Sequence, residues 1–163
     1  MTDYTATHPH YLFVYGTLKK PFGNHQVLTT HGAHFISDAR TMESAFTLTE
    51  NFPFVYKPYF AAEREYYRPN MGKIVGELYK VSDAGLEACD RLEGHPHAYC
   101  RTPTTVEFGT AAIPQRVTAG LYLYHSGAAH EDLLKPRDGL LEWGVERNLR
   151  LERSHPQFQR RKA

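Results

Sequence analysis

Apolar stretches separated by turn residues indicate a chain in which strands predominate. Residues 11–15 are aromatic or aliphatic throughout, and this run stops at Gly16, which is typical of a buried strand. A second clear run precedes Ser82. We therefore predict strands at residues 11–15, one or two within 33–47, and at 73–81, 102–108 and 118–124.

The segment after residue 81 has the punctuation of a helix. Ser82 can cap the first turn, residues 83–92 form the predicted helix, and Gly94 is well placed to end it. Three residues at helical spacing are expected to form its apolar face: Leu86, Cys89 and Leu92.

Two more helices and one loop are predicted. Asn24 can cap a short helix over residues 24–30, and residues 66–72 are expected to form a loop. Residues 138–151 are predicted as an amphipathic helix with three residues on its apolar side: Leu141, Val145 and Leu149.

The chain has 163 residues, a length that fits one domain. We expect a flexible tail over residues 1–10, a single domain over residues 11–151 and a basic tail over residues 152–163. Strands predominate and a few helices are mixed in irregularly. This pattern predicts the α+β class, with a barrel-like sheet and helices outside it.

Composition and charge restrict the function classes. The formal net charge is +1, and the chain lacks the clustered positive charge of a protein that binds nucleic acid. No nucleic-acid partner is therefore expected. Residues 1–10 lack the apolar core of a signal peptide, and no stretch has the roughly 18 apolar residues of a membrane span. The two cysteines, Cys89 and Cys100, are expected to be reduced thiols, which favours a cytoplasmic protein. We expect a monomer.

The first candidate for chemistry is the turn after the first strand, where Gly16 precedes polar residues. Glycine permits close approach of a ligand to the backbone. Successive N–H groups in such a turn can form a concave site for an anion, and a carboxylate there would need no side-chain cation. A purely structural turn is the alternative interpretation of this segment.

The second candidate is Glu93, at the end of the predicted helix and just before Gly94. A carboxylate there meets the negative end of the helix dipole, and partial burial among apolar groups would also raise its pKa. A general base that works near neutral pH needs such a raised pKa. The alternative is an ordinary solvated surface acid.

Together the two motifs resemble those of the gamma-glutamyl cyclotransferase superfamily. The sequence Tyr15-Gly16-Thr17-Leu18 is similar to the family's substrate loop, where a tyrosine, a glycine, a serine or threonine and a small or apolar residue close the first strand. The threonine and the sequence of residues 90–102 are most similar to the gamma-glutamylamine cyclotransferase branch, which is related to the avirulence-induced plant proteins. The resemblance covers residues 11 to about 124.

The resemblance implies a partly closed, mixed β-barrel with flanking helices. It implies that a γ-glutamyl amine, such as γ-glutamyl-ε-lysine, is cyclised to 5-oxoproline and a free amine without a cofactor or a metal. Six residues would form the site: Glu93 as the catalytic acid/base, with Tyr15, Gly16, Thr17, Leu18 and Tyr99 binding the small-molecule substrate.

Several alternatives stay open at this point. The substrate could be a γ-glutamyl dipeptide, or the chain could be a ligand-binding relative without activity. Tyr15 and Tyr99 could be packed aromatics with satisfied hydroxyls. Arg101 could orient Glu93 or be a surface charge. The histidines of residues 8–10 and 95–97 do not have the spacing of a recognised zinc site, so no metal is expected.

Overall fold

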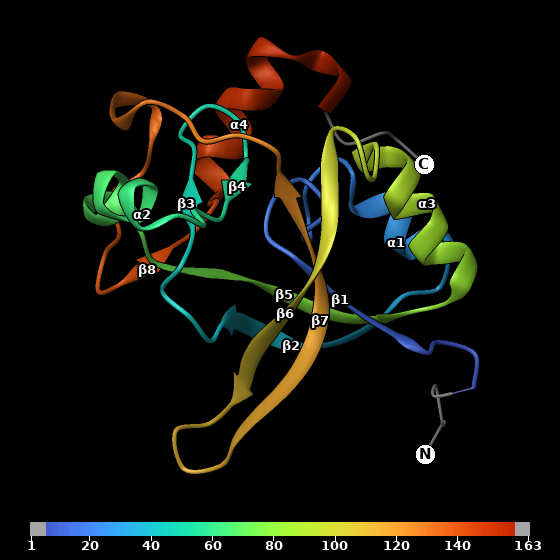
Figure 1. The fold of residues 1–163 in the computed structure, drawn as a ribbon. Coiled ribbons are helices and arrows are strands. Elements are labelled where there is room, and N and C mark those ends of the chain that lie inside the picture. Colours follow the sequence, from blue (N-terminus) through green and yellow to red (C-terminus); the bar gives the residue numbers. More distant parts are fainter. Residues whose placement is uncertain (1–5, 159–163) are drawn as a thin grey trace.

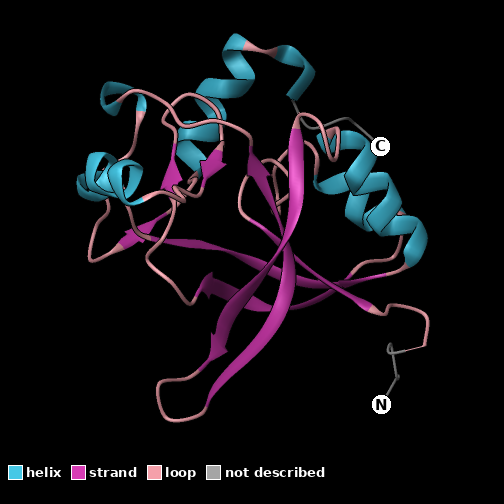
Figure 2. Cartoon of the chain, viewed as in Figure 1, coloured by secondary structure: helices cyan, strands magenta, loops and turns pink. Residues whose placement is uncertain are grey.

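The computed structural model describes residues 6–158. Its centre is a closed mixed barrel with strand order β1–β7–β6–β2–β5, closed because β5 also pairs antiparallel with β1 (Figure 2). The strands are β1 (His10–Val14), β2 (His34–Thr41), β3 (Thr47–Leu48), β4 (Val55–Tyr56), β5 (Lys73–Val81), β6 (Tyr99–Gly109), β7 (Pro114–Tyr124) and β8 (Leu140–Leu141). The predicted α+β barrel with outer helices is confirmed.

The helices cover two sides of the barrel. In Figure 1, α1 and α3 lie side by side at one side, whereas α2 and α4 lie toward the other. The helical elements are α1 (His25–Thr30), α2 (Ala61–Tyr67), η1 (Arg68–Asn70), α3 (Asp83–Glu93), η2 (His130–Asp132), α4 (Val145–Ser154) and η3 (Pro156–Phe158).

Strand β1 is apolar on both faces because both faces are covered. Phe13 packs in the main core inside the barrel, and Leu12 and Val14 pack with residues of α1 and α3 in a second core. Successive strand residues point to opposite faces, so this alternation explains the continuous apolar run. Full burial of such a side chain contributes about 1.5–3 kcal/mol. Both cores therefore fix the point at which β1 ends.

Helix α3 follows its sequence signals closely. The hydroxyl of Ser82 accepts a hydrogen bond from the N–H of Gly85 at 3.1 Å, and Gly94 ends the helix in the left-handed conformation at φ 66°. The predicted strand before it matches β5. Leu86 and Cys89 are buried as expected, but Leu92 is 42% exposed. The prediction of Leu92 as an inner residue is therefore wrong.

The predicted helix over residues 138–151 is also wrong in its first half. Asp138 and Gly139 have φ values of 51° and 76°, which no α-helix accommodates. Leu141 instead lies in β8 and pairs in parallel with Ile74. Helix α4 starts only after Gly144, and the two remaining members of the predicted apolar side are exposed: Val145 and Leu149. Leu151 is the leucine of α4 that is buried.

Two smaller predictions need correction. Residues 66–72 are not a loop, because α2 and η1 cover most of them; α2 buries no residue, so it has no apolar stripe to reveal it. Asn24 precedes α1 as predicted but makes no side-chain capping bond. The predicted strands 102–108 and 118–124 belong to the longer strands β6 and β7.

At the chain ends, β1 already begins at His10, and helical turns continue beyond residue 151. Residues 1–5 and 159–163 of the predicted tails lie outside the described residues. Within residues 6–158, no helix is both long enough and apolar enough to cross a membrane.

Candidate active site

A cavity of about 230 Å³ lies where β1 ends. It is enclosed by the turn after β1, the end of α3, the adjoining ends of β6 and β7, and the segment 52–54. All six residues singled out from the sequence line it: Tyr15, Gly16, Thr17, Leu18, Glu93 and Tyr99. The two motifs, almost 80 positions apart in the chain, therefore meet at one site.

The turn is held rigidly from two sides. Gly16 is covered by Pro53, because a Cβ at residue 16 would lie only 2.7 Å from the Cβ of Pro53. Asn24 fixes the next residue: its N–H donates to the carbonyl of Thr17 at 3.1 Å, and its side-chain amide donates to the Thr17 hydroxyl at 2.7 Å. The side chain of Asn24 therefore braces the turn, which is why it does not cap α1.

The turn leaves hydrogen-bond donors unused. Among the described residues, none accepts a hydrogen bond from the backbone N–H groups of Gly16, Thr17 or Leu18. The next side chain, Lys19, is buried and donates to the carbonyl of Trp143 at 2.7 Å. Unpaired N–H groups at a cavity can donate hydrogen bonds to an anionic ligand. The neighbouring cation, Lys19, is already bonded to Trp143, so the N–H groups are the donors that the turn offers.

Glu93 is the last residue of α3 and only partly accessible to solvent. Burial raises the pKa of its carboxyl from its ordinary value to about 7. In the described part of the chain, no hydrogen bond or ion pair engages this carboxyl group. The alternative of a solvated surface acid is therefore excluded, and Glu93 can exchange a proton near neutral pH.

Tyrosine side chains surround Glu93. The Tyr15 hydroxyl donates to the carbonyl of Tyr122 at 2.6 Å, so Tyr15 is a packed aromatic with a satisfied hydroxyl. The Tyr99 ring packs against Phe54 and Tyr124, with centroid distances of 5.8 and 5.4 Å. Burial and the nearby Glu93 raise the pKa of Tyr99, which keeps its hydroxyl neutral and able to donate a hydrogen bond.

The aromatic segment 52–54 is not among the six residues singled out from the sequence. The Thr49 hydroxyl donates to the carbonyl of Phe52 and accepts from the N–H of Phe54 at 3.0 Å, which holds this segment over the turn. Phe52, Pro53 and Phe54 all line the cavity. Their only signal in the sequence is the density of aromatic and proline residues near position 53.

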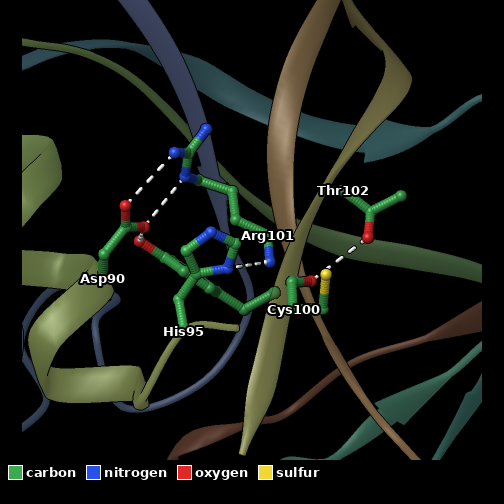
Figure 3. Close-up of polar contacts among 6 residues, drawn as sticks. Asp90, His95, Cys100, Arg101 and Thr102 are labelled. Atoms are coloured by element: carbon green, nitrogen blue, oxygen red, sulfur yellow. Dashed lines mark hydrogen bonds and ion pairs between the residues drawn. The ribbon is translucent and has the colours of Figure 1, made fainter. Parts of the chain in front are cut away.

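A polar cluster beside the site was also missed. The guanidinium of Arg101 donates two hydrogen bonds to Asp90, at 2.8 and 3.1 Å (Figure 3). The Tyr122 hydroxyl donates a third to Asp90 at 2.7 Å. The N–H of Arg101 also donates to the His95 ring at 2.9 Å. Arg101 is thus a structural partner of Asp90. Helical spacing relates Asp90 to Glu93, but it does not indicate that Arg101 or Tyr122 faces Asp90.

Two histidines near the start of the chain contact other parts of the protein. His8 contacts the carbonyl of Gly32, and His10 pairs with Asp83 at 2.6 Å. Over residues 6–158, no three His, Cys, Asp or Glu side chains gather as metal ligands do.

A larger cavity of about 730 Å³ lies between α1 and β5, away from Glu93 and the turn. Its carboxylate, Glu77, already accepts hydrogen bonds from the N–H of Lys20 and the hydroxyl of Tyr79. Size alone does not identify a reactive site, and the smaller cavity holds the carboxyl group whose pKa burial raises to about 7.

Comparisons with known proteins agree with the geometry. The family model described as gamma-glutamyl cyclotransferase, AIG2-like, matches residues 12–143. A protein of Methanocaldococcus jannaschii is 32% identical over 70% of this chain and 83% of its own length. Proteins named gamma-glutamylaminecyclotransferase are 37% identical in Danio rerio and 34% in Mus musculus, over 56% and 60% of this chain. The chain spans only 55% and 63% of these two relatives.

The fold comparison agrees as well. The crystal structure of an AIG2-like protein from Mus musculus matches with a TM-score of 0.59 and 30% identity, over 78% of this chain and 84% of that one. Sequence and fold thus lead to the same group of proteins. The chain belongs to the gamma-glutamyl cyclotransferase, AIG2-like family.

Proposed function

We propose that this chain is a gamma-glutamylamine cyclotransferase, which converts a γ-glutamyl amine into 5-oxoproline and the free amine. The observation that carries the proposal is the pairing of Glu93, whose pKa is raised to about 7, with the unused N–H groups of the turn at one cavity. A base and an anion site at one cavity suit a substrate that carries its own nucleophile.

Glu93 acts as the base and then as the acid. It takes a proton from the substrate's α-ammonium, and the resulting amine attacks the γ-carbonyl carbon to form the new C–N bond of the ring. The proton on Glu93 then passes to the departing nitrogen as the old C–N bond breaks and the carbonyl re-forms. The ring nitrogen gives its second proton to the regenerated Glu93 carboxylate, which passes it to the released amine. Proton transfer of this kind accelerates reactions by roughly 10²–10⁴-fold.

The N–H groups of Gly16, Thr17 and Leu18 bind the α-carboxylate and fix the glutamyl unit in a folded conformation. Ring closure needs the α-amine within about 3–3.5 Å of the γ-carbonyl carbon. Tyr15 and Tyr99 line the cavity around the glutamyl unit. The segment 52–54 covers the turn and helps to exclude water, which would otherwise compete with the amine.

The leaving amine is assigned from the relatives named gamma-glutamylaminecyclotransferase, whose activity we extend to this chain. A panel of γ-glutamyl-ε-lysine, γ-glutamyl-alanine and glutathione, scored for 5-oxoproline, tests this assignment. We expect γ-glutamyl-ε-lysine to be cyclised fastest. Preference for γ-glutamyl-alanine would assign the dipeptide activity instead.

Glu93→Gln tests the mechanism, because it keeps the shape of the side chain but removes the base. Glu87→Gln on the exposed face of the same helix, where Glu87 pairs with Arg91, is the matched control. Turnover at the wild-type rate in Glu93→Gln would refute the role of Glu93. Binding of γ-glutamyl-ε-lysine without turnover by the wild type would identify an inactive relative.

The setting of the enzyme is part of the proposal. Cys89 and Cys100 are both free, and Cys100 is exposed, as suits a reducing compartment; we therefore assign the protein to the cytoplasm. We also assign it as a monomer that acts on a small molecule without a nucleic-acid partner. Light scattering of the purified chain measures its mass in solution and so tests whether it is a monomer.

A further inference from the structure

Three hydrogen bonds join a group of side chains that take no part in the proposed proton transfer. We call this group, which consists of Asp90, Arg101 and Tyr122, the clamp. It joins three elements: Asp90 lies on α3, Arg101 on β6 and Tyr122 on β7. Arg101 and Tyr122 are direct partners in the β6–β7 ladder, so both donors come from one place on the barrel wall. A planar guanidinium with two bonds to one carboxylate fixes orientation as well as distance.

The clamp reaches both halves of the site. Asp90 and Glu93 are three residues apart on α3, which places their side chains on neighbouring parts of one helix face. At the other end, the carbonyl of Tyr122 accepts the hydrogen bond of the Tyr15 hydroxyl, immediately before the turn. The clamp therefore connects the last turn of α3 to the strand end that carries the unused N–H groups.

Charge is the second aspect of the clamp. Burial alone would raise the pKa of Asp90, but hydrogen bonds from Arg101 and Tyr122, with the Arg101 charge, lower it overall. Asp90 is therefore ionised at neutral pH, and its charge is compensated by Arg101. Without Arg101, an unpaired negative charge would lie one helical turn from Glu93.

We propose that Asp90, Arg101 and Tyr122 act as positioning residues, which hold Glu93 against the turn and keep the charge beside Glu93 close to neutral. The proposal rests on the function proposed for Glu93. It extends that function because none of the three residues takes part in the proton transfer itself.

Four other titratable side chains interact with Glu93. They are Tyr15 at the end of β1, Tyr99 on β6, Tyr122 on β7, and Cys89 on α3 itself, and burial raises the pKa of each. All four are neutral at pH 7. The Asp90–Arg101 pair, one helical turn from Glu93, is therefore the charged pair whose balance the substitutions change.

The test compares three variants that alter this balance in known directions. Asp90→Asn leaves the Arg101 cation unpaired, so the acid limb of kcat/KM moves to lower pH, by about half a unit to one unit. Arg101→Gln leaves the Asp90 anion unpaired, so the limb moves to higher pH by a similar amount. The double variant is neutral and returns the limb to the wild-type position.

A merely structural role would lower stability and kcat without moving the limb in opposite directions. Arg101→Lys separates position from charge: it keeps the cation but loses the two-bond geometry, so kcat falls while the limb stays in place. Glu87→Gln, which breaks an exposed pair on the same helix, leaves both kcat and the limb unchanged.

A second measurement does not depend on turnover. The side-chain carboxyl carbon of Glu93 is titrated by NMR in each variant, and the same opposite shifts are expected. Shifts in one direction, or none in variants whose circular dichroism is native, would overturn the proposal. If the wild type cyclises no substrate, the proposed function fails, but the titration still decides whether the clamp controls Glu93.

Discussion

The two carboxylates at the end of α3 show how differently one helical turn can treat the same chemical group. Asp90 receives three hydrogen bonds, two from Arg101 and one from Tyr122, and its pKa is lowered. Glu93 receives none from the described residues, and burial raises its pKa to about 7. The environment, rather than the acid itself, decides which carboxylate is structural and which can carry a proton.

The difference follows from what lies opposite each acid. Asp90 faces polar groups on adjacent barrel strands, whereas Glu93 lies on a cavity lined mainly by aromatic and apolar side chains. A charge in such a cavity loses water without gaining donors, so the protonated form is favoured. Strongly shifted pKa values are common at functional sites. Asp90, a hydrogen-bonded carboxylate on the same helix, shows what the pKa of an acid becomes when it has partners.

Exchanging each acid for its amide gives the largest expected contrast. Glu93→Gln should reduce kcat by roughly 10²–10⁴-fold, because it removes the proton acceptor. Asp90→Asn keeps the proton acceptor and should retain at least about tenfold more activity than Glu93→Gln. Release of 5-oxoproline at pH 8 measures both. Equal losses in the two variants would remove the functional distinction between these acids.

The pH profile is the next contrast. Glu93 must be ionised to accept a proton, so kcat/KM should fall about tenfold for each pH unit below its pKa of about 7. Asp90, with a lowered pKa, should add no inflection in the same range. A profile of kcat/KM from pH 5 to 9 checks this, and a flat profile down to pH 5 would contradict the raised pKa of Glu93.

Much of this comparison could be predicted from the sequence, because its signals are local. Ser82 and Gly94 set the limits of α3, and the end of an apolar strand placed Gly16 at a turn. The meeting of Glu93 with that turn required the family resemblance. The sequence could indicate that Glu93 is partly buried. How far burial raises its pKa depends on side chains from distant segments, which the sequence does not show.

Other features could not be predicted because they depend on pairing between distant segments. Leu141 fits a helical period with Val145, yet its partner is Ile74 of β5, and the turn at Asp138 is visible only in backbone angles. Similarly, nothing near Arg101 in the sequence indicates that it faces Asp90. Spacing predicts which residues share an element, but not what that element packs against.

Removal of the Arg101 guanidinium should weaken the fold more than loss of an exposed ion pair. Arg101→Gln leaves Asp90 partly buried without its cation, and we expect a loss of about 1–3 kcal/mol in the free energy of unfolding. Arg91→Gln breaks the pair with Glu87, whose side chains are both more than 70% exposed, and should change little. Urea denaturation at pH 7 compares the two variants, and equal stabilities would show that the clamp adds nothing to the fold.

The smallest expected effect is a gain in stability at Glu93. Its pKa is about 7 in the folded chain and near 4.5 when unfolded, so the folded state binds more protons between these values. Stability from this group is therefore present below about pH 4.5 and lost as the pH rises through about 7. Glu93→Gln removes this loss and should stabilise the protein at pH 8 by about 1–2 kcal/mol, less than the full shift because the cavity admits water. Thermal denaturation at pH 5 and pH 8 measures the gain, which should be larger at pH 8.

Asp90→Asn is the matched control and should destabilise at both values, because Asp90 is ionised and hydrogen-bonded in the fold. If Glu93→Gln is less stable than the wild type at pH 8, the Glu93 carboxylate stabilises the fold, as Asp90 does. Burial of its charge would then carry no net cost in the free energy of unfolding.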